Sequence, residues 1–163
     1  MATKQISVER FSVTSRKSFD SVVAAIDAAI GHPEMAAFRE DVSAAKSHAD
    51  LEKAIQRGLG PTGLMEFARY DLGEILRKQS GGKAPRILRL VAGNPLIMKQ
   101  MVEHVHDAGS YAPVTILIDE RPDGVHISYD RMASYLATYQ SAEPMKVARD
   151  LDAKVEAILT AAA

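Results

Sequence analysis

A turn between two apolar segments is one candidate ligand-binding site in this sequence. Residues 87–92 are nearly all apolar, which is typical of a strand buried on both faces. Gly93-Asn94-Pro95 follows, and residues 96–105 then have helical spacing. Backbone N–H groups at such a strand end hold carboxylates and phosphates in α/β proteins. The alternative is a helix capped by Asn94, with Pro95 in its first turn, that needs no ligand.

The helix expected after this turn carries side chains suited to haem or a soft metal ion. Met98, Met101 and His104 share one helical stripe, and thioether and imidazole groups are common ligands of haem iron. The alternative is a core-facing stripe that ends in a histidine near the negative end of the helix dipole. His106 does not extend the site, because residues two apart on a helix diverge by about 200°.

The segment from Ser128 to Arg131 closes the second strand of an expected hairpin. His126, Ser128 and Asp130 fall on one strand face, a combination that invites comparison with a hydrolytic triad. Neighbours on one strand face rarely aim a nucleophile at its base, and no strained nucleophile-elbow motif surrounds the serine. The alternative is therefore a solvent-facing polar row. Tyr129 and Arg131 can still bind or polarise a substrate.

Composition excludes several other kinds of chemistry. The chain has no cysteine, which rules out thiolate catalysis, sulfur-ligated zinc and iron–sulfur clusters. Ser80-Gly81-Gly82-Lys83 only partly resembles a phosphate-binding loop, because it precedes a strand and Ala84 stands where the motif needs Ser or Thr. The formal net charge is −1. Such a balance gives no electrostatic footprint for nucleic acid or an anionic membrane, so neither is expected as a partner.

Hydrophobic periodicity and turn residues predict the elements that position these groups. Strands are expected near residues 6–14, 64–70, 87–92, 114–119 and 125–129, and helices near 19–30, 33–42, 48–59, 73–78, 96–105, 131–139 and 141–159. Pro122-Asp123-Gly124 between two apolar runs predicts a hairpin turn, and Gly31 fits a left-handed helix end. Ser18, Ser47 and Asp71 are expected to cap helix N-termini, and Pro33 suits the first turn of a helix. This order predicts an α/β fold with a mixed sheet of about five strands, helices packed on it and one clear hairpin.

Length and terminal composition predict the domain organisation and the location. The 163 residues suit a single domain spanning 1–163. The N-terminus has no apolar leader, and apolar runs such as Val22–Ile26 fall short of the ~20 residues that span a bilayer. We therefore expect a cytoplasmic protein.

An ordered series of short motifs resembles the domain-of-unknown-function 302 (DUF302) family. The series runs through Gly93-Asn94-Pro95, Ala112-Pro113-Val114, Pro122-Asp123-Gly124-Val125 and Ser128-Tyr129, within Gly63 to Tyr139. The resemblance implies a compact α/β domain with a mixed sheet, often found as a homodimer. It also implies that haem or another small ligand is bound by some relatives.

Two features depart from the family pattern. Asp71-Leu72 stands where members often carry Asp-His, so no role for that histidine transfers. Residues 32–60 look like a helical insertion that covers a face or builds a dimer contact.

Three functional hypotheses follow. The first is a non-enzymatic, homodimeric protein that binds or senses a small ligand, with haem as one candidate, at a pocket near Gly93, Asn94, Met98, His104 and Tyr129. The second is a metal-independent enzyme that uses general acid/base chemistry, with His126 or His104 as the base and Tyr129 and Arg131 as polarising groups. The third is a protein-interaction module, which predicts an exposed apolar patch on Met35, Phe38 and Leu51.

Overall fold

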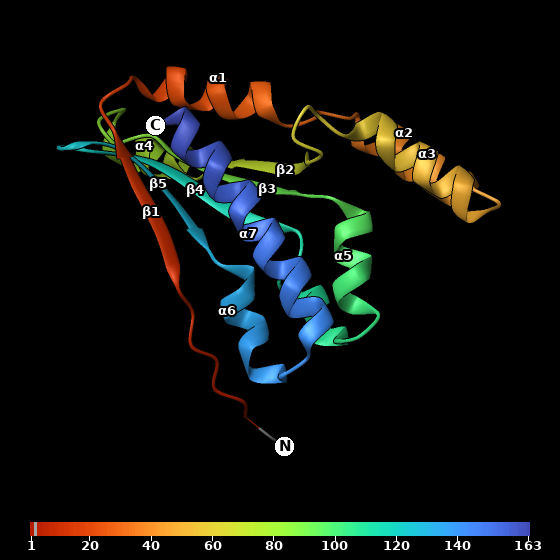
Figure 1. The fold of residues 1–163 in the computed structure, drawn as a ribbon. Helices are drawn as coiled ribbons and strands as arrows, with labels where there is room; N and C mark the ends of the chain where they lie inside the picture. Colours follow the sequence, from red (N-terminus) through yellow and green to blue (C-terminus); the bar gives the residue numbers. More distant parts are fainter. Residues whose placement is uncertain (2) are drawn as a thin grey trace.

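A five-stranded sheet forms the centre of the protein (Figure 1). The computed structural model describes residue 1 and residues 3–163. The sheet contains β1 (Arg10–Ser15), β2 (Met65–Asp71), β3 (Ile87–Gly93), β4 (Val114–Arg121) and β5 (Gly124–Asp130), in the order β1-β5-β4-β3-β2. All four neighbouring strand pairs are antiparallel, and parallel pairing takes the form of an isolated bridge between Gly31 and Met65. The predicted α/β fold, its strand number and the β4–β5 hairpin are confirmed.

Helices cover one face of this sheet. These helices are α1 (Phe19–Ala29), α5 (Pro95–Val102), α6 (Met132–Leu136) and the long α7 (Ala142–Ala162), which crosses the sheet in Figure 1. Of two short 3-10 turns, η1 (His106–Ser110) follows α5 and η2 (Ala137–Tyr139) follows α6 in the sequence. Alternate residues of β5 point under the helices, where Val125, Ile127 and Tyr129 are buried together with Leu151 and Val155 of α7. This cluster is the main hydrophobic core.

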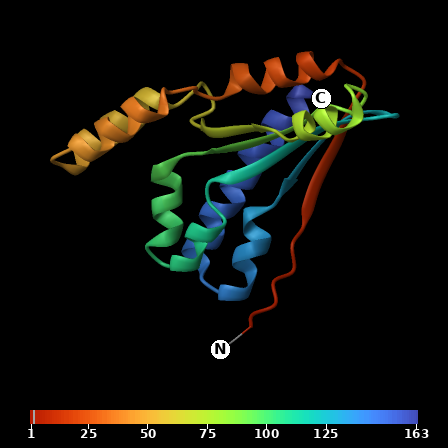
Figure 2. The same cartoon turned by 180° about the vertical axis from the view of Figure 1, so that it is seen from behind.

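The opposite face of the sheet is open. Seen from behind, the strands lie in front of α7, and α4 (Leu72–Ser80) lies at one end of this side (Figure 2). Alternate strand residues on this face are exposed or half-buried, as in Arg89 of β3, Thr115 of β4 and Ser128 of β5. A sheet with one covered and one solvated face is typical of antiparallel folds. Any site on the open face is therefore accessible to solvent.

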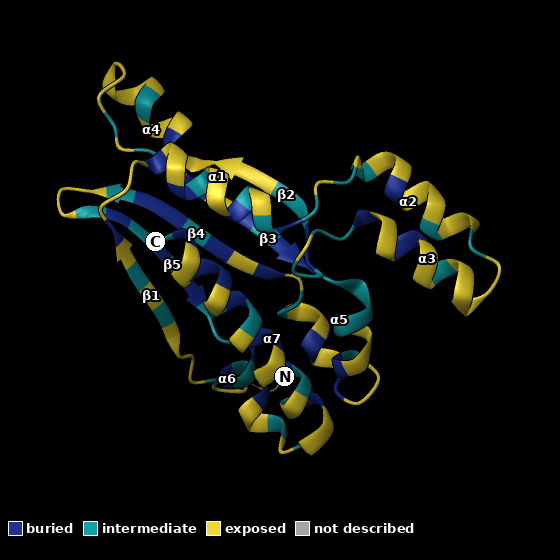
Figure 3. Ribbon diagram, turned by 45° about the horizontal axis from the view of Figure 1, so that its top comes forward, coloured by how far each residue is buried: buried dark blue, intermediate teal, exposed yellow. Residues whose placement is uncertain are grey.

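The segment 32–60 forms a helical hairpin that projects from one corner of the sheet (Figure 3). It contains α2 (Met35–Ala44) and α3 (His48–Gly58). Phe38 and Ile55 pack with Met65 of β2 in a second hydrophobic cluster, and the ring of Phe67 lies 6.4 Å from that of Phe38, edge to face. The hairpin thus packs on β2 and on Leu96 of α5, in a cluster separate from the main core.

Helix caps are the local features that the sequence predicted best. The side chains of Ser18, Ser47 and Asp71 each accept a backbone N–H three residues on, as expected. Pro33 does not lie in the first turn of a helix as predicted. Glu34 caps α2 instead, since its carboxylate accepts from the N–H groups of Ala36 and Ala37 at 3.0 and 2.7 Å.

Gly31 also differs from its prediction, because α1 ends on Ile30 in an extended conformation and not on a left-handed glycine. The chain needs glycine at this position for space: a Cβ on Gly31 would lie 2.0 Å from the carbonyl oxygen of Gly58. Within residues 1 and 3–163, no helix is both long and apolar enough to cross a bilayer.

Candidate functional site

The five site residues predicted from sequence lie in three different places. Gly93, Asn94 and Met98 line an apolar pocket of about 90 Å³, which we call the Met98 pocket. His104 lines a shallow hollow with His106 and Tyr139. Tyr129 is one of the residues around a larger pocket on the open face.

Gly93 and Asn94 have structural tasks at the Met98 pocket. A Cβ on Gly93 would lie 3.1 Å from Cβ of Pro113, so glycine permits the close approach of these two segments. The amide of Asn94 donates to the carbonyl oxygen of Gly63 at 2.9 Å and accepts from the N–H of Leu96 at 2.8 Å. Asn94 therefore caps α5, and both its amide nitrogen and its amide oxygen are already hydrogen-bonded within the protein. Of the two interpretations of this turn, the structure agrees with the capped helix and not with an anion site formed by the turn.

Met98 and His104 do not form a shared ligand site. α5 ends at Val102, so His104 lies beyond the helix and the predicted stripe stops at Met101, which is fully buried. The His104 side chain is 45% exposed, and its nearest acidic neighbour is Glu103 at 3.9 Å. Met98 and His104 line separate hollows, so they are not placed to act together as the two axial ligands of a haem iron.

Tyr129 points into the core. Its hydroxyl donates to Asp152 of α7 at 2.5 Å, and the same Asp152 oxygen accepts the N–H of Met132 at 2.7 Å. The other oxygen accepts the N–H of Ala133 at 3.0 Å, so Asp152 caps the start of α6 from a different helix. Burial and the carboxylate of Asp152 raise the pKa of Tyr129, which keeps the phenol protonated.

The residues proposed for acid/base catalysis do not converge. His126 lies on the open face, where its ring contacts Asp123 at 2.8 Å and Thr14 at 3.5 Å. Tyr129 faces the helices from the same strand, and Arg131 is held by Glu156 through two hydrogen bonds. With the base and the polarising phenol on opposite sides of the sheet, the enzyme hypothesis loses its geometric basis.

The interaction patch expected on Met35, Phe38 and Leu51 is also absent from the described surface. Phe38 is buried, and Met35 and Leu51 are half-buried against the same cluster. Exposed apolar side chains gather instead at the end of β2 and on α4, at Tyr70, Leu72, Ile75 and Leu76.

A polar hollow lined by Ser128 and Tyr129 lies on the open face of the sheet, and we call it the open-face pocket. Its volume is about 420 Å³, within the ~300–1,000 Å³ range of small-molecule sites. Its lining consists of Arg10, Arg89, Val91, Ser110, Tyr111, Pro113, Val114, Thr115, Leu117, Ser128, Tyr129, Asp130 and Tyr135.

The two arginines of this pocket differ in how they are paired. Arg10 and Asp130 form two hydrogen bonds of 2.6 and 2.9 Å, which lower the pKa of Asp130. Arg89 contacts the hydroxyl of Thr115 at 3.5 Å and lies over the ring of Tyr70. Among the described residues no carboxylate lies within ion-pair distance of Arg89. Its guanidinium therefore presents an uncompensated positive charge to the open face.

Strand register brings these groups together from distant parts of the sequence. Val91 pairs with Thr115, and Leu117 pairs with both Arg89 and Ser128, so side chains of β3, β4 and β5 form one surface. At one side, the rings of Tyr111 and Tyr135 stack with centroids 4.5 Å apart. Sequence reasoning named Ser128 and Tyr129 but missed Arg89. A lone charge inside an apolar strand was the available signal.

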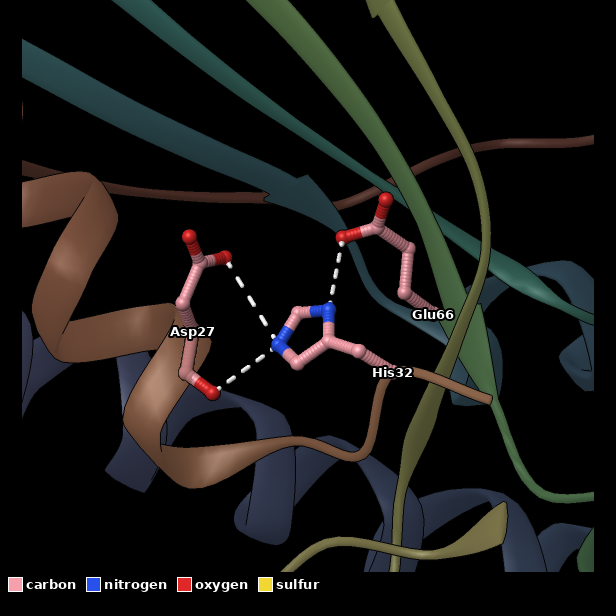
Figure 4. Close-up of side chains that lie close together, drawn as sticks. All are labelled: Asp27, His32 and Glu66. Atoms are coloured by element: carbon pink, nitrogen blue, oxygen red, sulfur yellow. Dashed lines mark hydrogen bonds and ion pairs between the residues drawn. The ribbon is translucent and has the colours of Figure 1, made fainter. Parts of the chain in front are cut away.

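A second cluster of ligating side chains lies where the projecting hairpin joins the body (Figure 4). Asp27 of α1, His32 and Glu66 of β2 each offer one ligand atom within 4.8 Å of the others. The ring of His32 lies between the two carboxylates, with Nδ1 3.5 Å from Glu66 and Nε2 3.0 Å from the backbone oxygen of Asp27. Arg69 bridges Asp27 and Glu66 from the same neighbourhood.

Comparisons with known proteins identify the family. The sequence profile of the family described as "Domain of unknown function DUF302" matches residues 40–162, beginning inside α2. A crystal structure of an uncharacterized conserved DUF302 protein from Bacillus stearothermophilus is similar, with a TM-score of 0.65 and 10% identity. That similarity covers 94% of this chain and 98% of the other, and it shows a shared fold. No curated protein matches the sequence. Because the family profile spans most of its length, this chain belongs to the domain-of-unknown-function 302 family.

Proposed function

We propose that the protein binds or senses a small organic anion in the open-face pocket. The observation that carries this proposal is the free guanidinium of Arg89, which lines a pocket of about 420 Å³. Arginine presents several N–H donors in a planar fork that matches carboxylate and phosphate groups. The hydroxyls of Thr115 and Ser128 line the same pocket and can donate to a bound oxygen.

The neighbouring Met98 pocket supports a ligand with an apolar part. The two pockets share the lining residues Pro113 and Val114. Besides Met98, the smaller pocket is lined by Phe67, Ile97 and other apolar side chains. An acid group on Arg89 and a short apolar group at the Met98 pocket would use both surfaces. Gly93 and Asn94, the predicted strand-end residues, then shape the pocket and do not contact the charge.

Haem fits this arrangement poorly. The Met98 pocket, at about 90 Å³, is far below the size of typical cofactor sites. His104 lies in another hollow, so the chain offers no paired Met and His ligands there. We therefore propose a small acid and not haem as the ligand.

The proposal is tested with thermal unfolding in the presence of short-chain carboxylates, aromatic carboxylates and phosphate monoesters. A ligand present at 100 times its Kd stabilises the folded state by about 2.7 kcal/mol, which raises Tm measurably. Arg89→Gln should abolish the ligand-dependent rise in Tm, because it removes the charge but keeps most of the side-chain volume.

Arg39→Gln is the matched control. Arg39 lies on α2, is exposed, and is remote in the sequence and on the fold from the open face. The control should keep the full rise in Tm. Equal ligand responses in the Arg89 and Arg39 variants would show that Arg89 does not bind the anion.

We also propose that the protein forms a homodimer through the apolar patch of Tyr70, Leu72, Ile75 and Leu76. Ile75 is 71% exposed, and the patch adjoins β2, the strand at one end of the sheet. Isolated exposed apolar residues are ordinary, but contiguous ones often mark interfaces. Glu74 and Lys78 lie beside the patch and pair with each other at 2.6 Å, so a two-fold axis could exchange them between protomers.

A charge placed in the patch should prevent this dimer. Ile75→Glu is expected to yield a monomer in sedimentation or light-scattering measurements where the unmodified protein is dimeric. Val8→Glu is the control, because Val8 is also exposed but precedes β1 at the opposite end of the sheet. A monomeric unmodified protein, or a dimer that survives Ile75→Glu, would remove the proposal.

A further inference from the structure

We propose that Asp27, His32 and Glu66 form a binding site for a divalent transition-metal ion at the base of the projecting hairpin. The three residues come from the last turns of α1, the following loop and β2. Each of the three residues has one potential ligand atom within 4.8 Å of those of the other two. Among the described residues, this is the group of acidic and histidine side chains that lies close enough to hold one metal ion. The site is separate from the open-face pocket, so this proposal does not depend on the proposed anion binding.

The orientation of the His32 ring is the first support. Nε2 lies 3.0 Å from the backbone carbonyl oxygen of Asp27, so it donates its hydrogen there. In the neutral ring this leaves the lone pair on Nδ1, which lies 3.5 Å from a carboxylate oxygen of Glu66. A lone pair facing a carboxylate is repulsive unless a positive charge lies between them. Metal-binding histidines commonly donate their other N–H to a backbone carbonyl in this manner.

The spacing between Nδ1 and Glu66 is the second support. A distance of 3.5 Å is long for an N–H to oxygen hydrogen bond, which is usually about 2.7–3.2 Å. Two donor atoms that each lie about 2.1 Å from one tetrahedral zinc ion are separated by about 3.4 Å. The two atoms are therefore placed as ligands of one ion. Asp27 offers the third ligand atom within 4.8 Å of the other two, and its Oδ1 lies 3.9 Å from Nε2 of the same ring.

Arg69 holds the carboxylates in place. It makes hydrogen bonds with both oxygens of Glu66, at 3.0 and 2.6 Å, and it also contacts Asp27. A carboxylate oxygen has more than one lone pair, so it can accept from an arginine and ligate a metal together. Hydrogen-bonded carboxylates are usual around metal sites. The positive charge of Arg69 also opposes a second cation, which predicts moderate and not tight affinity.

The donor set selects the class of metal. One imidazole and two carboxylates suit Zn²⁺, Mn²⁺, Fe²⁺ or Ni²⁺ better than Ca²⁺, which takes six to eight oxygen ligands. The side chain of Glu66 is 14% exposed, whereas those of Asp27 and His32 are 33% and 43% exposed. The open side leaves coordination positions for water or another ligand.

The test is calorimetric titration of the protein with Zn²⁺, supported by the visible absorption of bound Co²⁺. We expect one site that His32→Ala and Glu66→Gln each weaken by at least about 100-fold, and a Co²⁺ spectrum that disappears with it. Removal even of groups that only support a metal ligand commonly costs 10–100-fold. Two variants are used so that misfolding of either one, checked by circular dichroism, leaves the other as the test.

Two control variants address other histidines. His48→Ala removes an exposed histidine beside Glu52 on α3, and His104→Ala removes a histidine that lines the same hollow as His106. Both should keep the affinity of the unmodified protein. A site lost in His104→Ala, retained in folded His32→Ala, or undetectable in the unmodified protein would overturn the proposal.

Discussion

Asp152 has the most consequential role among the residues that the sequence did not single out. Its carboxyl group joins Tyr129 to the first two N–H groups of α6, so one side chain satisfies three donors, two of them buried. Nothing in the local sequence signals this, because Asp152 lies on the buried side of α7, where an apolar residue is expected. The sequence suggested Tyr129 as a ligand-binding or polarising residue, whereas in the structure its hydroxyl is hydrogen-bonded to Asp152 in the core.

The ionisation of Asp152 should make stability depend on pH. Burial raises its pKa above the ordinary value of about 3.9. The folded state then holds this proton more tightly than the unfolded state, and the associated stability is lost as pH rises from about 4 through the raised pKa.

Asp152→Asn should remove this part of the pH dependence. Urea unfolding of both proteins, measured at several values between about pH 3 and 7, gives the comparison. The free energy of unfolding of the unmodified protein should fall relative to the variant as pH rises. If the free energy of unfolding of the unmodified protein instead rose relative to that of the variant, the hydrogen bonds to Asp152 would lower its pKa by more than burial raises it.

At the scale of elements, close glycine contacts fix the base of the α2–α3 hairpin. The N–H of Gly31 donates to Leu64 at 2.8 Å, and the carbonyl oxygen of Gly31 accepts the N–H of Glu66 at 2.8 Å. Gly60 donates to the same Leu64 oxygen at 2.9 Å. These bonds bring the two ends of the hairpin together, beside the ring of His32.

Gly31→Ala should strongly disturb this junction. The added Cβ would meet backbone atoms that cannot move away as a flexible side chain does, with Gly58 O only 2.0 Å distant. We expect a loss of about 2–3 kcal/mol in the free energy of unfolding. Gly109→Ala is the control, because its nearest atom would be 3.8 Å away, and it should change stability by less than about 0.5 kcal/mol. Equal effects would contradict the packing account.

The sequence predicted elements better than it predicted faces. The Pro122-Asp123 turn and the serine and aspartate caps depend on local chemistry, and they were confirmed. By contrast, Leu72, Ile75 and Leu76 have the spacing of a core-facing stripe, yet all three are exposed. Which side of a helix is covered depends on elements distant in the sequence, and a hydrophobic period does not contain that information.

At the scale of the whole molecule, the two faces of the sheet have different roles. The face under the helices holds the hydrophobic core, and the open face holds the candidate binding pocket. Stabilising groups such as Tyr129 lie under the helices, and polar groups such as Ser128 alternate with them on the open side. Predicting the open-face pocket would have required the register of three strands, and hydrophobic periodicity does not determine that register. Gly93, Asn94 and Met98 were placed near a pocket, whereas the pocket around Arg89 becomes evident only in the fold. That residues 1–163 form one domain and that residues 32–60 are an insertion stay predictions.

The most direct test of anion binding is to map the bound ligand by amide chemical shifts. A small carboxylate or phosphate ester that raises Tm is titrated into uniformly ¹⁵N-labelled protein. We predict that the largest shifts occur at Arg89, Val91, Thr115 and Ser128, with saturation at one equivalent. Shifts concentrated at His104 and His106, or spread evenly over the surface, would contradict the account.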